Sequence, residues 1–461
     1  MNRRPRRLLL ALAALSALTA GTAALAGPPV PAEPATAASY PADSHAATYR
    51  TFDAKGRAST TKWHWTSVGG NCCETYVSTT GSRLLEFGGS LPYYSDTHGK
   101  TWSRVDFLTP VVNGEGAIVG GPNGNIYGIG WDPYSGDHLQ AVRYTAATKT
   151  WEVGESPIHT PVFDREWITY AKGPFTVDGV TVPFVTIVRG GTATKQVEQI
   201  SSDGLSYTDI SDPNSDIGGD PIRMRIPVVP NPAADDWQPN PGTYTVPLNA
   251  GGVLLLDNGD DQLGCPAARL NASTLKWQCV VLPWTPKGVV RQDSRGWLTQ
   301  AARVSSDEIE LKTSPDGGKT WRSLTLTSPV GGKFEGGADF FDLKVNGKLG
   351  QAVVSTRVDD KKSIGQDLVW RVDVSKAQPR LMTTYAVGKG DISTIIGVAG
   401  AVADRFDYPS IALFPDGRIA VSFDDSTTPK SKGNNDLPIA SYEANPNGHS
   451  PAVAILDAWR G

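Results

Sequence analysis

The fold is decided by one short stretch of the chain, Ser314-Pro315-Asp316-Gly317-Gly318-Lys319-Thr320-Trp321. Its serine and aspartate are short side chains that accept backbone N–H groups within a tight turn, and its glycines tolerate positive φ. The closing Thr-Trp pair places a large ring where it packs back onto a sheet. The stretch therefore predicts a β-hairpin whose turn is held by its own side chains.

The same turn recurs along the chain in less complete form. Its copies are Tyr94–Trp102 (YSDTHGKTW), Ser201–Tyr207 (SSDGLSY), Thr150-Trp151 and Lys276-Trp277, of which the last two keep only the aromatic end. In the first copy, Thr97 stands where the aspartate belongs and Asp96 is displaced by one position. Between the turns, short alternating or fully apolar runs replace the 3.6-residue period of helices. Repetition of one strand-turn unit predicts an all-β chain.

The pattern SxDxGxTW is the Asp-box, or BNR repeat, and the chain resembles the sialidase-like family of β-propellers. The resemblance implies four-stranded antiparallel blades around a central channel, with the Asp-boxes on the outer turn between the third and fourth strands. The aromatic anchors recur about every 55 residues, so about 400 ordered residues predict seven blades, with six as the alternative. In this family the Asp-boxes lie away from the active site, so Asp96, Asp203 and Asp316 are expected to be structural.

The N-terminus has the order of a secretory signal. Arginines at 3, 4, 6 and 7 precede an apolar run, and Ala24-Leu25-Ala26 is a small-x-small cleavage site. Residues 1–26 are therefore predicted to be a signal peptide. The Pro/Ala/Ser/Thr-rich segment 27–61 is predicted to be a disordered leader, and residues 62–461 a single propeller domain. The expected location is extracellular, with no membrane anchor after cleavage.

Composition and charge limit the classes of binding partner that are expected. The chain is 39% hydrophobic and 20% charged, with 49 glycines and 34 prolines, as suits a turn-rich globular protein. The formal net charge is −4, and removal of the signal arginines makes the mature chain more acidic. Binding to nucleic acid needs a basic face, so this partner is not expected. We expect a monomer.

Four cysteines in an exported chain predict two disulfides. Cys265 and Cys279 flank what looks like a strand, a turn and a strand, so a bond between them would close one hairpin. Cys72 and Cys73 are adjacent, and either they bond to each other or each bonds elsewhere. Neither metal nor cofactor is predicted, because the cysteines lack a CxxC spacing and nearby histidines. The acidic run 257–261 has enough carboxylates for calcium, but a solvated turn also accounts for it.

The resemblance puts function on the face where each blade's innermost strand begins. Carboxylates and arginines are frequent in the segments assigned there, which suits a sugar pocket, although the same residue types also suit bonds to loop backbone. The predicted catalytic residues are Asp164, Glu166, Asp404, Asp407 and Tyr408. The predicted substrate-binding residues are Glu74, Arg165, Arg225, Trp297, Asp339 and Arg405.

These residues predict a secreted carbohydrate-active protein, in first place a sialidase-like glycoside hydrolase acting on extracellular glycans or polysaccharide. Arg225-Ile226-Pro227 matches the arginine motif of sialidases, but it follows the first Asp-boxes instead of preceding them. Two alternatives remain open. One is a polysaccharide lyase on the same scaffold, and the other is a propeller that binds glycan or cell-wall polymer without catalysis, because fold alone does not fix function.

Overall fold

The computed structural model describes fourteen segments of the chain, which are residues 39–40, 44–67, 75–88, 91–104, 116–131, 139–154, 167–192, 195–209, 243–257, 267–334, 341–359, 364–391, 410–425 and 450–456. Nearly every element in them is a β-strand, and the helical part of the described residues is one 3-10 turn, Pro122–Gly124. The prediction of an all-β chain is therefore confirmed. No helix among these residues has the length and apolar character needed to cross a membrane.

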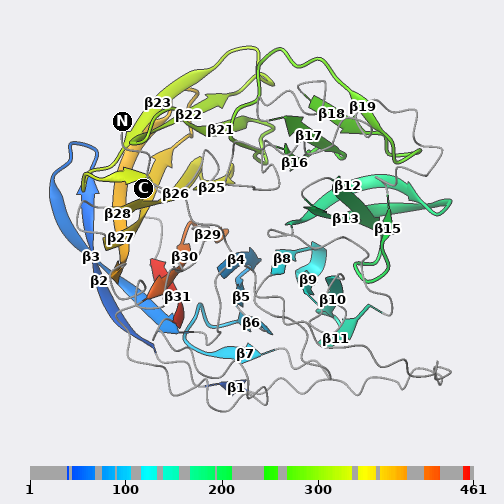
Figure 1. The fold of residues 1–461 in the computed structure, drawn as a ribbon, viewed down its shortest axis with the longest axis horizontal. Helices are drawn as coiled ribbons and strands as arrows, with labels where there is room; N and C mark the ends of the chain where they lie inside the picture. The colour runs from blue at the N-terminus through cyan, green and yellow to red at the C-terminus, as the bar shows by residue number, and fades with distance from the viewer. Residues whose placement is uncertain are drawn as a thin grey trace, which may run out of the picture.

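Five separate antiparallel sheets are arranged around a common centre (Figure 1). Each runs outward in sequence order from an innermost strand, and the first gains the short strand β1 on its outer edge. Their strands are β1 (Ser39–Tyr40), β4 (Thr75–Thr80), β5 (Arg83–Gly88), β6 (Leu91–Ser95) and β7 (Trp102–Arg104); β8 (Gly116–Gly120), β9 (Ile126–Trp131), β10 (Leu139–Thr145) and β11 (Thr150–Val153); β12 (Trp167–Val177), β13 (Val180–Thr192), β14 (Lys195–Ser201) and β15 (Thr208–Asp209); β16 (Thr243–Pro247), β17 (Val253–Asp257), β18 (Ala267–Leu270) and β19 (Trp277–Cys279); β20 (Val289–Gln292), β21 (Leu298–Arg303), β22 (Glu308–Ser314) and β23 (Arg322–Thr327).

The remaining strands form one ten-stranded sheet. Its order is β24-β26-β27-β28-β2-β3-β31-β30-β29, with β25 also paired to β26. The strands are β2 (Ser44–Asp53), β3 (Ala58–Ser67), β24 (Lys333–Phe334), β25 (Phe341–Asn346), β26 (Gln351–Asp359), β27 (Ile364–Asp373), β28 (Arg380–Asp391), β29 (Ser410–Leu413), β30 (Ile419–Asp425) and β31 (Ser450–Leu456). This sheet folds back on itself, because β25 and β29 lie near its opposite ends and yet touch each other.

The arrangement is propeller-like, but the prediction of seven or six separate four-stranded blades is wrong. The structure has five separate blades and the ten-stranded sheet. The reason is the hairpin β2–β3, which pairs with β28 on one side and β31 on the other and so joins the two arms of that sheet. Contacts between neighbouring innermost strands close the ring in the order β4, β8, β12, β16, β20, β25 and β29.

The prediction of a disordered leader over residues 27–61 does not hold for 39–40 and 44–61, where β1, β2 and the start of β3 lie; residues 27–38 and 41–43 are outside the described residues. In β2 the residues Ala47, Tyr49 and Thr51 are more buried than their neighbours Thr48 and Arg50. Such alternation is the period of a strand with one covered face. The buried positions of this strand are occupied by small and hydroxylated residues, so the composition of the segment does not indicate a strand.

The two edges of the ring differ in their connections. The innermost strands start at one edge, here called the leading edge. Within each blade, the turns joining the first strand to the second and the third to the fourth lie at the opposite edge, here called the turn edge, because successive strands alternate in direction. The tip of the hairpin β2–β3 also lies at the turn edge, since Asp53 is level with Thr383 near the start of β28.

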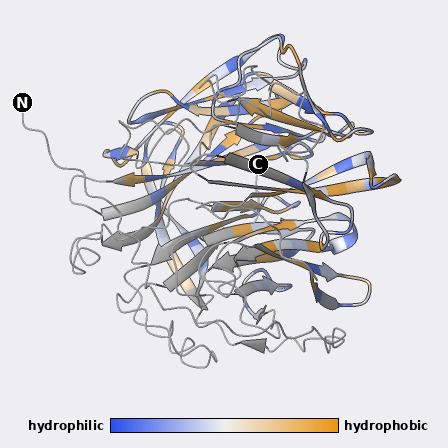
Figure 2. Ribbon diagram, turned by 45° about the vertical axis from the view of Figure 1, so that its right-hand side comes forward, coloured by the Kyte–Doolittle hydropathy of each residue, from blue (hydrophilic) through white to orange (hydrophobic). Residues whose placement is uncertain are grey.

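Hydrophobic residues pack between neighbouring sheets, and Figure 2 shows them along the strands. Trp63 and Trp65 of β3 are buried against Val369 and Tyr385 of one arm and Val421 of the other. Trp63 meets Tyr385 edge to face, with ring centroids 5.2 Å apart, a favoured aromatic arrangement. The N-terminal hairpin therefore contributes the core between the two arms of the ten-stranded sheet.

The turn that decided the sequence analysis has the predicted bonds. Ser314 Oγ accepts the Gly318 N–H at 2.7 Å and donates to Asp316, whose other bonds come from the N–H and hydroxyl of Thr320. The turn joins β22 to β23, the third and fourth strands of their blade. Asp316 itself is exposed, and its bonds from Thr320 and Ser314 lower the pKa of its carboxyl to about 2.

Two of the other copies, 94–102 and 201–207, have hydrogen bonds that agree with the alignment of the motif. Ser201 Oγ accepts the Gly204 N–H, and Asp203 accepts the N–H groups of Leu205 and Ser206. In the first copy the Thr97 hydroxyl accepts the Thr101 N–H at 2.8 Å. Asp96 points away and binds Arg83. Thr97 therefore accepts the same hydrogen bond that the aspartate accepts in the complete motif.

The buried serine of this turn matters more to stability than its aspartate does. Ser314 is fully buried, and Ser314→Ala removes the acceptor of the Gly318 N–H. We expect a loss of about 1–3 kcal/mol in the free energy of unfolding, the cost of an unsatisfied buried donor. Denaturant unfolding measures it, with exposed Ser323→Ala as control. The contribution of Asp316 is present above its unfolded pKa of 3.8 and is lost as the pH falls through about 2.

Candidate functional site

Charged side chains gather on one face of the ten-stranded sheet, where β25 meets β29. Leu343 and Val345 of β25 pack into the core on the side of β20–β23. Asp342 and Lys344 alternate with them and so point to the other side, towards β29. Asp342 Oδ2 accepts the Ile411 N–H at 3.2 Å, and Lys344 Nζ lies 2.9 Å from Asp342. One carboxylate therefore connects two innermost strands close to their starts.

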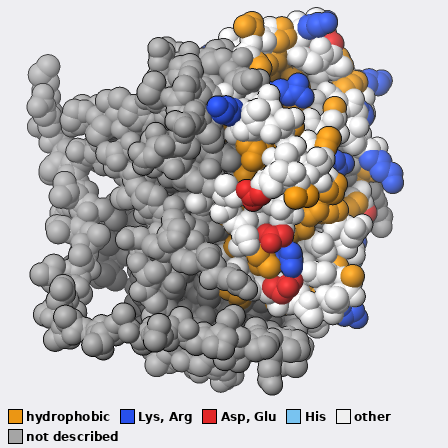
Figure 3. Space-filling view, turned by 90° about the vertical axis from the view of Figure 1, so that its right-hand side faces the viewer, with side chains coloured by type: hydrophobic (Ala, Val, Ile, Leu, Met, Phe, Trp, Pro, Cys, Tyr) orange, Lys and Arg blue, Asp and Glu red, His pale blue; other side chains and the backbone are white. Residues whose placement is uncertain are grey.

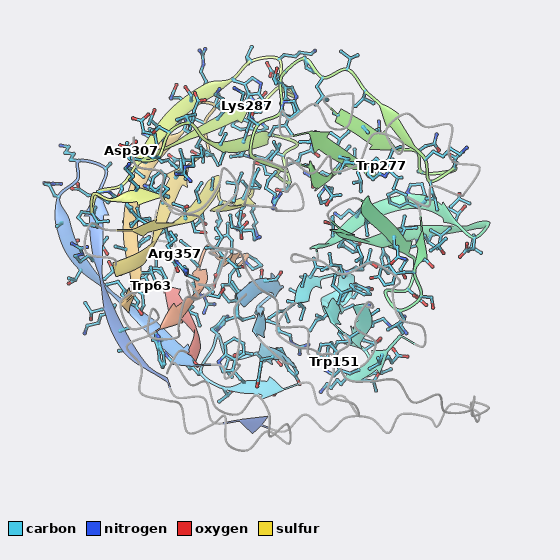
Figure 4. All side chains as sticks on the ribbon, viewed as in Figure 1. Trp63, Trp151, Trp277, Lys287, Asp307 and Arg357 are labelled. Atoms are coloured by element: carbon cyan, nitrogen blue, oxygen red, sulfur yellow. The ribbon has the colours of Figure 1, made fainter. Side chains whose placement is uncertain are left out.

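The next two strands add a buried ion pair to this face. Arg357 of β26 and Asp367 of β27 are opposite each other in the ladder, with Nε and Oδ1 3.2 Å apart. Their exposed fractions are 8% and 2%. Removing both charges from water costs several kcal/mol per ion, which the pair and its hydrogen bonds must offset. Figure 4 shows Arg357 on the side of the ring that also holds Trp63.

A third group lies on the same face, further from the leading edge. Arg371 Nη1 donates to the Tyr385 hydroxyl at 3.3 Å, and the Tyr385 ring packs on Trp63. Burial lowers the pKa of the Arg371 guanidinium from its ordinary value, although arginine stays protonated at any physiological pH. Trp63, Tyr385 and Arg371 therefore connect the outer hairpin to the charged face.

The strand β29 is held from its other side by β4. Ser410 Oγ accepts the Val77 N–H at 3.0 Å, and the Thr79 hydroxyl donates to the Leu413 carbonyl at 3.2 Å. The leading ends of β25, β29 and β4 are thus consecutive and bonded to one another. We call these three strand starts, with Asp342, Arg357 and Asp367, the leading-edge site.

Most of the site residues predicted from sequence lie outside the described residues. They are Glu74, Asp164, Arg165, Glu166, Arg225, Asp339, Asp404, Arg405, Asp407 and Tyr408. Their places in the chain can still be compared with the strands. Glu74 directly precedes β4, Asp339 precedes β25 by two residues, Tyr408 precedes β29 by two, and Glu166 directly precedes β12.

One of the assignments to strand starts is wrong. Trp297 follows β20 and belongs to the turn before β21, at the turn edge. There the Arg295 guanidinium lies 4.0 Å from the centre of its ring. Arg225 lies eighteen residues before β16, in a part of the chain outside the described residues, so its assignment stays a prediction.

The sequence analysis missed Asp342, Arg357 and Asp367. A signal for two of them was present, since the run 353–357 (VVSTR) ends in a charge and the run 367–371 (DLVWR) has charges four positions apart around an apolar stretch. Alternate residues of a strand point to the same face of the sheet, so a charged residue two or four positions from a buried apolar one lies on the same face as that residue. The charges in these two runs therefore indicate a charged face.

Metal ligation has no support among the described residues, where no group of three His, Cys, Asp or Glu side chains is placed to hold an ion. Of the acidic run 257–261, only Asp257 belongs to the described residues. Cys72, Cys73 and Cys265 lie outside them as well, so both disulfides stay predictions.

Comparison with known proteins assigns no family. No protein-family model matches the chain, and no curated protein matches it. Among solved structures it is similar to an endosialidase of phage phi92 (TM-score 0.37, 11% identity, covering 87% of this chain and 71% of that one). Others are a GH43 protein of Bacillus licheniformis (0.31, 10%, 71% and 60%) and a PL25 ulvan lyase (0.27, 11%, 78% and 73%). At such TM-scores and identities these likenesses give the chain neither a family nor an activity.

Proposed function

We propose that this chain is a carbohydrate-active β-propeller that hydrolyses extracellular glycans at the leading-edge site. The observation that carries the proposal is the bond from the Ile411 N–H to Asp342, which brings the starts of β25 and β29 together. Two residues of chain span at most about 7 Å. Asp339 and Tyr408, each two residues before one of these strands, are therefore within reach of the same small volume, and Asp407 is one residue further.

Two carboxylates in the segments before these strands would supply what glycoside hydrolysis needs. One carboxylic acid protonates the leaving oxygen, while a second carboxylate, or a tyrosine in its place, acts as base or nucleophile about 5–10 Å away. We assign these roles to Asp404 and Asp407 with Tyr408, and substrate contacts to Asp339 and Arg405. The cationic groups of Lys344 and Arg357 favour the ionised form of any carboxylate beside them.

The second predicted acidic segment fits the same reaction less well. Asp164 and Glu166 precede β12, and two innermost strands, β4 and β8, lie between β12 and β29 around the ring. We therefore propose that this segment contacts substrate from across the channel and that it does not supply the second catalytic carboxylate. Glu74 directly precedes β4, the neighbour of β29 in the ring, and we propose that it contacts substrate beside Asp404 and Asp407.

The test is a screen of the purified chain against neutral and acidic polysaccharides with two readouts. New reducing ends with no unsaturated product support hydrolysis. An ultraviolet-absorbing unsaturated uronate supports the lyase alternative. Retention on a glycan column with neither product supports a binding propeller and contradicts catalysis.

A variant pair tests the site itself. Asp407→Asn removes one proposed catalytic carboxylate, and we expect turnover to fall by about 10²-fold or more with little change in melting temperature. The control is Asp416→Asn, because Asp416 is an aspartate of the neighbouring turn, paired with Arg418, that lies at the turn edge. Turnover of Asp407→Asn close to that of the control would remove the leading-edge site as the catalytic centre. Asp164→Asn is expected to raise KM more than it lowers kcat.

A further inference from the structure

The turn edge carries a repeated lysine that the fold does not use. Three turns on this edge end in Lys-Thr-Trp, at 100–102, 149–151 and 319–321. In the last of them, Thr320 binds Asp316 and the Trp321 indole N–H donates to the Gly318 carbonyl at 2.9 Å. The backbone N–H of Lys319 also bonds Asp316, but its ammonium group has no hydrogen-bond or ion-pair partner among the described residues. Its threonine and tryptophan have structural roles, and its lysine projects into solvent.

Most of the described carboxylates of this edge are bound by arginines or by their own turns; the exposed Asp178, between β12 and β13, is not. Asp96 binds Arg83 through both oxygens, whereas Asp416 and Asp373 bind the guanidinium groups of Arg418 and Arg380 through Oδ2 alone. Their negative charge is therefore compensated locally. Asp203 and Asp316 accept bonds from their own turns.

Six exposed lysines remain on turns of this edge, and none of them lies within ion-pair distance of a carboxylate among the described residues. We call this set the lysine edge. It consists of Lys55, Lys100, Lys149, Lys319, Lys348 and Lys376. In Figure 3, Lys and Arg side chains project along the right-hand margin of the described surface. The edge is thus cationic in a chain whose formal net charge is −4.

We propose that the lysine edge binds an anionic polysaccharide, whose carboxylate or sulfate groups contact several turns at once. The lysines come from four different sheets around the ring, so a single small anion meets one of them while a long polymer meets many. The described arginines here are engaged with aspartates, and arginine is the preferred reader of nucleic-acid bases. The six turns present no exposed large hydrophobic side chain for insertion into a bilayer.

Binding at this edge leaves the leading edge free, because the two lie at opposite ends of the strands. The inference does not rest on the proposed hydrolysis. A chain without catalytic activity would bind in the same way, and Asp407→Asn is expected to bind like the wild type.

The experiment measures retention on immobilised polygalacturonate, dextran sulfate and neutral dextran at about 50 mM salt. At this salt concentration the Debye length is more than about 10 Å, so the attraction between charges is only weakly screened. We expect retention on both acidic polymers, lost at high salt, and none on neutral dextran. Replacing Lys100, Lys149 and Lys319 by glutamate should weaken binding at least about tenfold. The control replaces exposed Lys62, Lys287 and Lys333, which lie outside the turn edge, by glutamate, and should retain binding to within about threefold.

Three results would overturn the proposal: no retention of the wild type, equal loss in both triple variants, or tighter binding to anionic phospholipid vesicles or duplex DNA than to either acidic polysaccharide. If the glutamate variant does not fold, judged by its melting temperature, the triple glutamine variant answers the same question. It removes the three charges without adding any, and wild-type retention of that variant also contradicts the proposal.

Discussion

Trp63→Ala should lower the free energy of unfolding by about 3–5 kcal/mol, the usual cost of truncating a buried tryptophan. Trp63 is 2% exposed and lies in the core that joins both arms of the ten-stranded sheet. Its ring contacts Tyr49 as well as Tyr385, so little of the cavity is expected to refill. Denaturant unfolding measures the change.

The neighbouring exposed position provides the control, since Lys62→Ala is expected to change stability by less than about 0.5 kcal/mol. A stability loss at Trp63 as small as that at Lys62 would mean that the N-terminal hairpin is not part of the core. That outcome would restore the interpretation of this segment as a leader. Protease cleavage in 44–67 under native conditions would lead to the same conclusion.

Asp367→Ala should cost about 3–5 kcal/mol, because it leaves the Arg357 guanidinium buried without its carboxylate. The double variant Asp367→Leu with Arg357→Met removes both charges, and we expect it to recover most of the loss. The control is Asp416→Ala, which breaks an ion pair whose aspartate is 49% exposed. Breaking such an exposed pair costs about 1 kcal/mol or less.

If Asp367→Ala is as stable as the control, the charged face is hydrated and the site is more open than its burial indicates. If the double variant stays as unstable as the single one, the loss comes from packing and not from the unpaired charge. Either result would change the electrostatic account of the leading-edge site.

Local sequence predicted the parts of this fold that are held by local bonds. The motif at 314–321 specifies its own turn, because every bond in it joins residues at most four apart. Thr97 was aligned correctly for the same reason. The innermost strands β4, β12, β25 and β29 start close to where Glu74, Glu166, Asp339 and Tyr408 led us to expect them.

The parts that were missed depend on partners remote in the chain. Nothing near Ala47 or Thr51 shows that β2 pairs with β28, more than 300 residues away, so composition favoured disorder. Asp342 looks like any exposed strand residue until Ile411 is placed beside it. Arg357 and Asp367 are near in sequence, but their face of the sheet is the one on which Val353 and Val369 pack with Ile411 of β29 and Val421 of β30.

The position of β3 has a consequence for how the chain acquires its structure. His64 pairs with Ile455, so one of the first strands to be made needs one of the last as its neighbour. A ring closed by so distant a contact has a high contact order, which predicts slow folding with a late closing step. Until β31 is present, one side of β3 is an open hydrogen-bonding edge that a second chain can occupy. Chains shortened before residue 450 should therefore associate through β3, and a peptide covering 450–456, added in trans, should compete with that association.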